Sequence, residues 1–352
     1  MDDLELNPRI LAAVRKANLV SFPAILNLSS ADVERRTKLS ANDVRILLQT
    51  ISRRVFKNPS ATALELYQGT CPKSLRVSSL STGCEVLDAF LRGGILSPGI
   101  TEIAGESAAG KTQLCMQLCL SVQRSTVNGG LDGGAVYICT EDVFPSKRLH
   151  QLIENFQKRL SATKYHQLKL GDNIFIEHLS ERDQLVHCIQ YRIPLLLKQS
   201  RVKLIVVDSL AALFRCEFSP REAARRARHL QTLGAQLHRL SWLHDVPVVC
   251  VNQVTANMSN NSSSHSNQCQ LIPALGLAWS NLVQTRLMLG RTNYKLSSFD
   301  AAGHQPQPAD TERTVPETAG VPVRTMEVVF APHLPNDTCY FVVEAAGVRG
   351  LR

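Results

Sequence analysis

The sequence predicts an α/β protein with a mainly parallel central sheet, antiparallel C-terminal strands and a small all-helical domain in front. Apolar, strand-like runs alternate with helix-like segments from residue 100 to 254, which is typical of a parallel sheet with helices on both faces. Residues 1–57 contain helix-start signals instead of such runs. We therefore predict a helical domain at 1–57, a linker at 58–78 and the α/β core at 79–352.

Four short helices account for the N-terminal domain, because helix-capping residues and Pro8 recur at short intervals. The turn Thr37–Ser40 lacks the glycine that would bring backbone N–H groups to a phosphate. The module resembles helix-hairpin-helix domains that touch DNA, and a protein-docking module is the open alternative. The first helix is expected to open at Asn7-Pro8 and run to about Asn18, and the second to begin at Ser21-Phe22-Pro23. The segments Ser29–Asp32 and Ser40–Asp43 are expected to cap the third and the fourth, and the fourth to run to Phe56.

Prolines at 59 and 72 interrupt the linker, and the core is expected to begin at Ser81-Thr82-Gly83. Two polar stretches, 257–270 and 291–320, are expected to be mobile without a ligand, the first as a binding loop and the second as an insertion in a hairpin. The strands are expected at 100–104, 135–141, 173–179, 202–210, 247–254 and then, as an antiparallel edge, at 282–289, 325–330 and 340–343. The helices are expected at 84–92, 111–124, after Pro145, at 181–199 with an interruption near Pro194, and at 221–244.

Residues 105–112 read G-x-x-x-x-G-K-T, the pattern of a phosphate-binding loop. Glycines at both ends let successive N–H groups point into one concavity, where they can bind the phosphates of a nucleotide. A strand precedes the pattern and a helix without Gly or Pro follows it, which is the context that the motif requires. The predicted binding residues are Gly105, Glu106, Ser107, Ala108, Ala109, Gly110, Lys111 and Thr112, with Lys111 contacting phosphate and the Thr112 hydroxyl ligating Mg²⁺.

Three later strand ends carry polar residues that could complete a nucleotide site. Asp208 ends an apolar strand and could hold Mg²⁺ through water. Glu141 could orient a water molecule for hydrolysis, although acids near helix starts are also common caps. Gln253 could sense the γ-phosphate, or it could simply make local hydrogen bonds at a strand end.

A group of arginines lies in one loop and at the start of the following helix. Arg221, Arg225 and Arg228 share a helix face, and Arg215 precedes them. Such a group could bind the phosphates of DNA, or it could be an ordinary solvated helix face. Phe214 and Phe218 could stack on bases or belong to the core.

Composition sets broader limits. The formal charge of +9 favours a polyanionic partner such as nucleic acid, although it also serves solubility. The ten cysteines form no C-x-x-C pair and several lie in apolar segments, as buried thiols do, so a disulfide framework or a zinc site is not expected. The N-terminus is acidic and has no long apolar run, so a signal peptide is not expected. No run of about 18 consecutive apolar residues occurs, so a membrane span is not expected either.

Taken in order, GESAAGKT, YICTED, KLIVVDS and VCVNQV resemble the RecA-type strand-exchange ATPases of eukaryotes, and the likeness extends over nearly the whole chain. Further segments, among them FRCEF, PALGLAW and APHLP, are similar to the recombinase paralogues of that family. The resemblance implies a RecA-like ATPase core with ATP and Mg²⁺ as ligands and a nuclear, partly cytoplasmic location. It also implies that Gln113 and Arg148 lie at the nucleotide, Arg148 on the adenine face, and that 215–228 and 255–271 face DNA.

Three departures from the family pattern bear on assembly. Ser60-Ala61-Thr62-Ala63 lacks the aromatic residue of the Phe-x-x-Ala motif by which members polymerise. Phe330 stands where members have an acid that caps a neighbour's ATP, and Asn281 stands where filament-forming members have a histidine. We therefore expect a weakly hydrolysing subunit that pairs with another paralogue, binds single-stranded or branched DNA and supports a recombinase filament. The alternatives are a self-polymerising strand-exchange ATPase and a non-hydrolysing scaffold.

Overall fold

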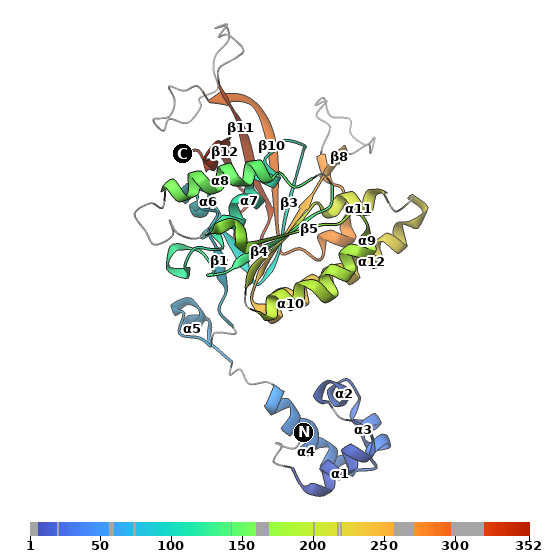
Figure 1. Ribbon diagram of the computed structural model, residues 1–352. Helices are drawn as coiled ribbons and strands as arrows, with labels where there is room; N and C mark the ends of the chain where they lie inside the picture. The colour runs from blue at the N-terminus through green and yellow to red at the C-terminus, as the bar shows by residue number, and fades with distance from the viewer. Residues whose placement is uncertain are drawn as a thin grey trace, which may run out of the picture. The chain divides into compact units, whose positions relative to one another are not determined.

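The computed structural model describes residues 6–19, 21–55, 60–72, 75–141, 143–159, 169–199, 201–216, 218, 220–256, 271–296 and 320–352. The chain divides into two compact units, Met1–Arg76 and Val77–Arg352. Figure 1 shows the helical unit and the α/β unit. Within the described residues, no helix combines the length and the apolar character that a membrane crossing requires.

The first unit contains the four expected helices and a fifth short helix, α5, in the stretch expected to be linker, and a side-chain cap precedes each helix. Asn7, Ser21 and Ser29 accept hydrogen bonds from backbone N–H groups of the helices that they precede, and Ser40 accepts one from Asp43 N at 3.2 Å. Val14, Ile25, Val33, Leu47 and other apolar side chains form its core. The helices are α1 (Pro8–Lys16), α2 (Phe22–Leu26), α3 (Ser30–Thr37), α4 (Ala41–Val55) and α5 (Ala63–Gln68).

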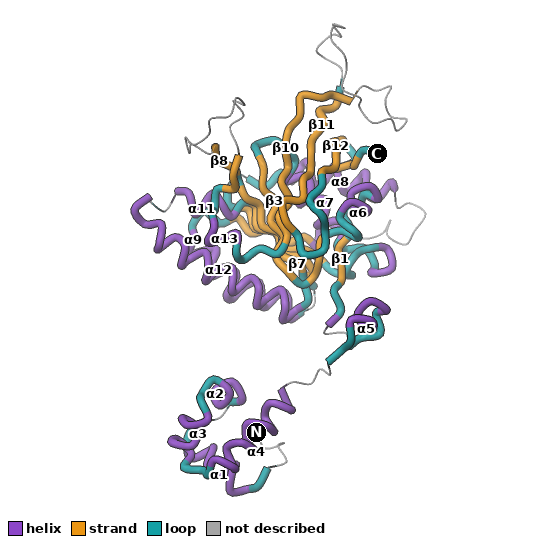
Figure 2. The backbone as a smooth tube through the Cα atoms, turned by 180° about the vertical axis from the view of Figure 1, so that it is seen from behind, coloured by secondary structure: helices purple, strands orange, loops and turns teal. Residues whose placement is uncertain are grey.

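The α/β unit contains a nine-stranded sheet in the order β13-β12-β11-β10-β3-β7-β6-β4-β5, with six neighbouring strands from β10 to β5 parallel. Figure 2 shows the strands gathered in the middle of this unit. The strands β11, β12 and β13 follow antiparallel to their neighbours. The predicted fold class is confirmed. The strands are β3 (Gly99–Gly105), β4 (Gly134–Cys139), β5 (Ile174–His178), β6 (Val202–Asp208), β7 (Pro247–Asn252), β10 (Thr285–Leu296), β11 (Val321–Phe330), β12 (Thr338–Glu344) and β13 (Gly347–Gly350).

Helices cover both faces of this sheet, and the two small ladders β1–β2 and β8–β9 lie outside it. One hydrophobic cluster joins the sheet to α6, α7 and α8, and the other joins it to α9, α10, α11, α12 and α13. The buried thiols of Cys115, Cys119 and Cys250 lie in these clusters, as the sequence predicts. The helices are α6 (Glu85–Phe90), α7 (Lys111–Ser121), α8 (Ser146–Arg159), α9 (Arg182–His187), α10 (Ile193–Lys198), α11 (Leu210–Cys216), α12 (Ala223–His244) and α13 (Leu277–Ser280), and the small strands are β1 (Ser78–Leu80), β2 (Ile95–Ser97), β8 (Val254–Ala256) and β9 (Leu271–Pro273).

Three details of the predicted elements are wrong or incomplete. The strand expected to open an antiparallel edge, β10, pairs parallel with β3, with Leu287 opposite Ile103. The chain reaches that position through the single turn of α13, so no long crossover helix announces it in the sequence. Arg215 lies on α11 rather than in a loop. The interruption expected near Pro194 is a π-helical turn at Cys188–Arg192, which ends two residues before that proline.

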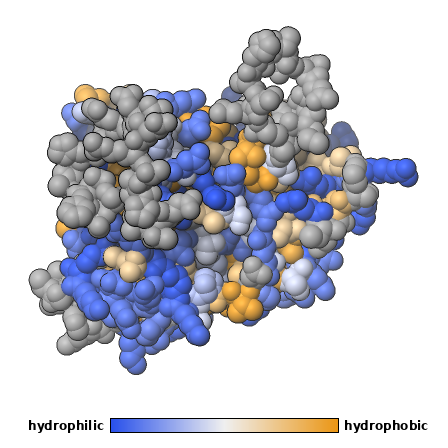
Figure 3. Space-filling model, turned by 90° about the horizontal axis from the view of Figure 1, so that it is seen from above, coloured by the Kyte–Doolittle hydropathy of each residue, from blue (hydrophilic) through white to orange (hydrophobic). Residues whose placement is uncertain are grey.

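The surface is mostly hydrophilic on the face that Figure 3 shows, with small separate apolar patches among the described residues. The polar segment 291–320 is confirmed as part of a hairpin, because Leu296 at the end of β10 pairs with Val321 at the start of β11. Residues 297–319 of it, and all of the expected binding loop at 257–270, lie outside the described residues.

Candidate nucleotide site

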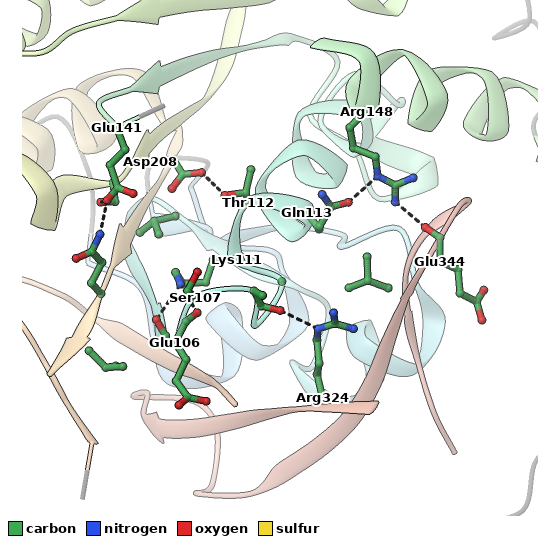
Figure 4. A pocket seen from close by; sticks show the side chains of 18 of the residues that line it. Glu106, Ser107, Lys111, Thr112, Gln113, Glu141, Arg148, Asp208, Arg324 and Glu344 are labelled. Atoms are coloured by element: carbon green, nitrogen blue, oxygen red, sulfur yellow. Dashed lines mark hydrogen bonds between the residues drawn. The ribbon is translucent and has the colours of Figure 1, made fainter. Parts of the chain in front are cut away.

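A pocket of about 950 Å³ opens at the carboxyl ends of the parallel strands (Figure 4). This edge of an open α/β sheet is where such folds bind ligands. Its polar groups come from the ends of β3, β4, β6 and β7 and the residues after them, from the first turns of α7 and α8, and from β11, and the β12–β13 turn supplies the opposite wall. The lining residues are Gly105, Glu106, Ser107, Ala108, Gly110, Lys111, Thr112, Gln113, Glu141, Arg148, Gln151, Asp208, Ser209, Val251, Gln253, Val254, Arg324, Val343, Glu344 and Ala345.

The loop from Gly105 to Gly110 has the backbone that the motif predicts. Gly105 has a φ of +156°, and a Cβ there would lie 2.3 Å from the Leu289 carbonyl oxygen. Gly110 has a φ of +103° and precedes the first residue of α7, where the free N–H groups at the start of the helix can bind an anion. All the predicted loop residues line the pocket except Ala109, whose side chain is buried in the core.

Lys111 folds back over this loop. Its ammonium group donates to the carbonyl oxygens of Gly105 at 2.8 Å and Glu106 at 2.6 Å. Burial lowers the pKa of Lys111, while the negative charges of Asp208 and Glu141 oppose that shift. An anion in the loop would compensate the partly buried positive charge, so the arrangement suits a phosphate group.

Thr112 and Asp208 meet at one side of the pocket. The Thr112 hydroxyl donates to Asp208 Oδ2 at 2.7 Å, across an interval of 96 residues. Burial raises the pKa of Asp208, and hydrogen bonds from Tyr137 and Thr112 oppose that rise. A hydroxyl and a carboxylate side by side are hard oxygen donors of the kind that Mg²⁺ takes together with water and phosphate oxygens. The residues therefore fit the metal that the sequence predicts.

Glu141 faces the same space and belongs to a chain of hydrogen bonds. Ser209 Oγ donates to Glu141 Oε1, and Gln253 Nε2 donates to the same oxygen at 2.5 Å. Arg215 Nη1 in turn donates to Gln253 Oε1 at 2.6 Å. The carboxylate thus makes contacts at the pocket rather than with the first turn of α8, which begins five residues later, at Ser146. This series of hydrogen bonds also connects the pocket with Arg215, one of the predicted DNA-facing arginines.

Arg148 closes the side opposite Glu141, as Figure 4 shows. Its guanidinium donates to Gln113 Oε1 at 2.7 Å and to the carbonyl oxygens of Glu344 at 2.6 Å and Ala345 at 3.0 Å. Burial lowers the pKa of Arg148. These bonds tie the β12–β13 turn to α7 and α8, so Arg148 has a structural role in shaping the pocket wall in addition to any contact with a base.

Sequence reasoning missed several residues at the site. Arg324 on β11 lines the pocket and donates to the Ala108 carbonyl oxygen at 3.1 Å. Tyr137, in the middle of β4, donates its hydroxyl to Asp208 Oδ2. Ser209 was visible as the residue after Asp208, but nothing in the sequence linked it to Glu141. A short sequence motif cannot indicate such residues, because their hydrogen-bond partners lie from about seventy to more than two hundred positions away in the chain.

The predicted DNA-facing arginines lie outside this pocket. Arg225 and Arg228 are exposed on the first turns of α12, where Arg225 pairs with Glu222 at 3.0 Å and Arg228 Nε bonds to the Ala224 carbonyl at 3.4 Å. Arg221 is exposed in the preceding 3₁₀ turn, and Arg215 is exposed on α11. We refer to these four arginines as the basic surface.

Three neighbours of these arginines have different surroundings. Arg226 donates to the Ala274 carbonyl at 2.7 Å and so ties α12 to the segment after β9. Phe214 is buried and stacks on Phe218 with ring centroids 5.9 Å apart. Phe214 belongs to the core cluster and the partly buried Phe218 packs against it, so the two rings take the core role that the sequence analysis gave as the alternative to base stacking.

Comparison with known proteins extends these observations. The Rad51 family model matches residues 73–306, and the model of the XRCC3/RpoA-like helix-hairpin-helix domain matches residues 1–55. The chain is 44% identical over 354 residues to the DNA repair protein XRCC3 of Bos taurus and 43% identical over 359 residues to that of Mus musculus, covering all of this chain and 98% of each relative. It is 31% identical over 310 residues to the DNA repair protein rhp57 of Schizosaccharomyces pombe, covering 79% of this chain and 84% of the relative.

Proposed function

Because this chain belongs to the Rad51 family, we propose that it is a recombinase-paralogue subunit that binds ATP with Mg²⁺, contacts DNA and supports a recombinase filament in homologous-recombination repair. The observation that carries the proposal is the meeting of Lys111, Thr112, Glu141 and Asp208 at one pocket. Lys111 suits contact with phosphate, Thr112 and Asp208 suit binding of the metal, and Glu141 suits orientation of the attacking water. The kinship to proteins named for DNA repair supports the biological role.

In this proposal the triphosphate lies along the loop 105–110, with its charge met by backbone N–H groups and by Lys111. Thr112 and Asp208 hold the metal, which supplies charge neutralisation at the phosphates when it is bound. Glu141 orients the attacking water and accepts a proton from it. Gln253 lies between Glu141 and Arg215, one of the DNA-facing arginines. We propose slow hydrolysis, used as a conformational switch.

Nucleotide binding is tested with a fluorescent ATP analogue in the presence of Mg²⁺. Replacing Lys111 by Ala removes a charge-assisted contact, so affinity should fall by about tenfold or more. Lys169→Ala, an exposed lysine that does not line the pocket, is the matched control and should bind like the wild type. Equal affinity of the Lys111→Ala protein and the wild type would refute the proposed site.

Hydrolysis is tested separately, by phosphate release from wild type and from Glu141→Gln. The amide keeps the shape of the side chain but cannot accept the proton, so turnover should fall by roughly a hundredfold or more. Unchanged turnover would remove the enzymatic part of the proposal and leave a subunit that uses nucleotide without hydrolysing it.

DNA contact is tested by the salt dependence of binding to single-stranded DNA. Arg225→Ala combined with Arg228→Ala should weaken binding and flatten the slope of log affinity against log salt by about 1.4, because each phosphate contact on a single strand contributes about 0.7. Arg239→Ala, exposed farther along α12 and outside the basic surface, is the control. An unaltered slope in the double variant would exclude this surface from DNA binding.

Pairing with another paralogue, rather than self-polymerisation, is supported by the chain's own residues. Ser60 replaces the aromatic residue of the family's assembly motif, and Phe330 replaces the acid. In addition, Leu64, Leu66 and Tyr67 of α5 are exposed, and α5 buries none of its side chains within this chain. We expect the isolated protein to stay small in size-exclusion chromatography with ATP and single-stranded DNA. Long filaments of this chain alone would contradict the proposal.

A further inference from the structure

Tyr137 occupies an unusual position beneath the candidate metal site. It lies on β4, with a side chain that is 1% exposed, and its hydroxyl donates to Asp208 Oδ2. The same oxygen accepts from the Thr112 hydroxyl. Strands β4 and β6 are parallel neighbours with Cys139 opposite Asp208, so Tyr137, two residues earlier on β4, reaches the carboxylate from below.

We propose that Tyr137 is a positioning residue that fixes the carboxylate of Asp208 for Mg²⁺. The inference rests on the proposed nucleotide site. Residues that hydrogen-bond a metal-holding carboxylate orient it, and their loss commonly weakens metal binding. The hydroxyl of Tyr137 is sealed in the core, and Asp208 is the partner that the structure gives it. Thr112, in contrast, faces the pocket and can also serve the ligand.

The negative charge of Asp208 needs hydrogen-bond donors because the carboxylate is half-buried. Asp208 is half-buried between strands and helix α7, where a carboxylate loses much of its hydration. Two hydroxyl donors on one oxygen replace part of that hydration. They also leave the second oxygen as the acceptor available to the metal and its water molecules. A carboxylate released from one donor would turn more freely, and the geometry that Mg²⁺ requires would be less often present.

The ring and the hydroxyl of Tyr137 have separable roles. The ring packs edge-on against Phe144, with centroids 4.9 Å apart and planes at 73°, within the core cluster. A phenylalanine would keep this packing and remove the hydrogen bond to Asp208 alone. Conversely, Phe144→Leu disturbs the packing and leaves the hydroxyl in place. These two variants therefore distinguish positioning of the carboxylate from support of the core.

The experiment measures affinity for a fluorescent ATP analogue across a Mg²⁺ titration and in EDTA, together with the melting temperature, for the full-length chain. For Tyr137→Phe we expect the Mg²⁺ midpoint to rise about tenfold, with affinity in EDTA equal to that of the wild type. Phe144→Leu should lower the melting temperature without moving the midpoint. Tyr191→Phe, the same chemical change at an exposed site, should alter neither quantity.

Two outcomes overturn the inference and leave the nucleotide site intact. One is a Tyr137→Phe protein with the midpoint of the wild type. The other is an equal shift of the midpoint in Phe144→Leu, which would assign the effect to packing. A wild type whose nucleotide affinity does not respond to Mg²⁺ at all would instead refute the proposed metal site, and this inference with it.

Discussion

A buried ion pair below the phosphate loop offers a sharp test of what stabilises the core. Glu102 on β3 is 0% exposed and pairs with Arg286 on β10, which is 7% exposed. The other carboxylate oxygen of Glu102 accepts from Asn252 Nδ2 at 2.6 Å. Arg286 also donates to Ser280 Oγ at 2.8 Å and lies over the Phe330 ring. The network joins the three strands β10, β3 and β7.

Replacing Arg286 by Met keeps much of the side-chain volume but leaves the carboxylate of Glu102 buried with Asn252 as its remaining described partner. Breaking one side of a buried pair typically costs about 3–5 kcal/mol, against at most about 1 kcal/mol for an exposed pair. Because both partners are buried, we expect about 4 kcal/mol of destabilisation. That is a large part of the roughly 5–15 kcal/mol that stabilises a typical protein.

The assay is urea unfolding followed by the fluorescence of Trp279, which is fully buried one residue before Ser280. The double variant Arg286→Met with Glu102→Leu is the essential control. It removes both charges, so it should be more stable than Arg286→Met alone. Part of that gain is offset because Asn252 Nδ2 loses its hydrogen bond to Glu102. A single variant within about 1 kcal/mol of the wild type, or a double variant no more stable than the single one, would refute the reasoning.

Further predictions concern backbone geometry, the helical unit and the link to DNA. Gly94→Ala should prevent folding or lower the melting temperature strongly, because φ is +113° and the new Cβ would lie 2.1 Å from the Leu80 carbonyl oxygen. Leu47→Ala should destabilise the helical unit by about 2–5 kcal/mol in chemical unfolding, since Leu47 is 0% exposed. Arg215→Ala removes the hydrogen bond to Gln253 Oε1, so DNA should change the rate of ATP turnover less than it does in the wild type; an undiminished DNA response would exclude the link.

Much of the site was predictable because its signals are local. The loop 105–112 depends on glycines and on a strand and a helix directly beside it, so neighbouring residues carry the information. Asp208 and Glu141 follow apolar strands, and parallel strands bring their carboxyl ends to one edge of the sheet. The capped starts of the N-terminal helices were readable for the same reason, since a cap and its partner lie three residues apart.

Other features depend on partners far along the chain. The parallel pairing of β10 with β3 follows from a short crossover that has no periodic helix pattern, and its register places Arg286 opposite Glu102. The position of Arg215 was missed because the short helix α11, Leu210–Cys216, directly follows β6, where the sequence indicated only a strand end and a loop. Arg324 meets the phosphate loop across more than two hundred residues.

The sequence by itself determined that this chain has an anion-binding loop, a mainly parallel sheet and carboxylates at the right strand ends. Backbone preference and hydrophobic periodicity act over a few residues, so they can be read without a structure. Only the tertiary structure decided that Tyr137 lies under Asp208 and that Gln253 joins Glu141 to Arg215. Those contacts arise when strands and helices pack, because packing alone brings together side chains that are remote in the chain.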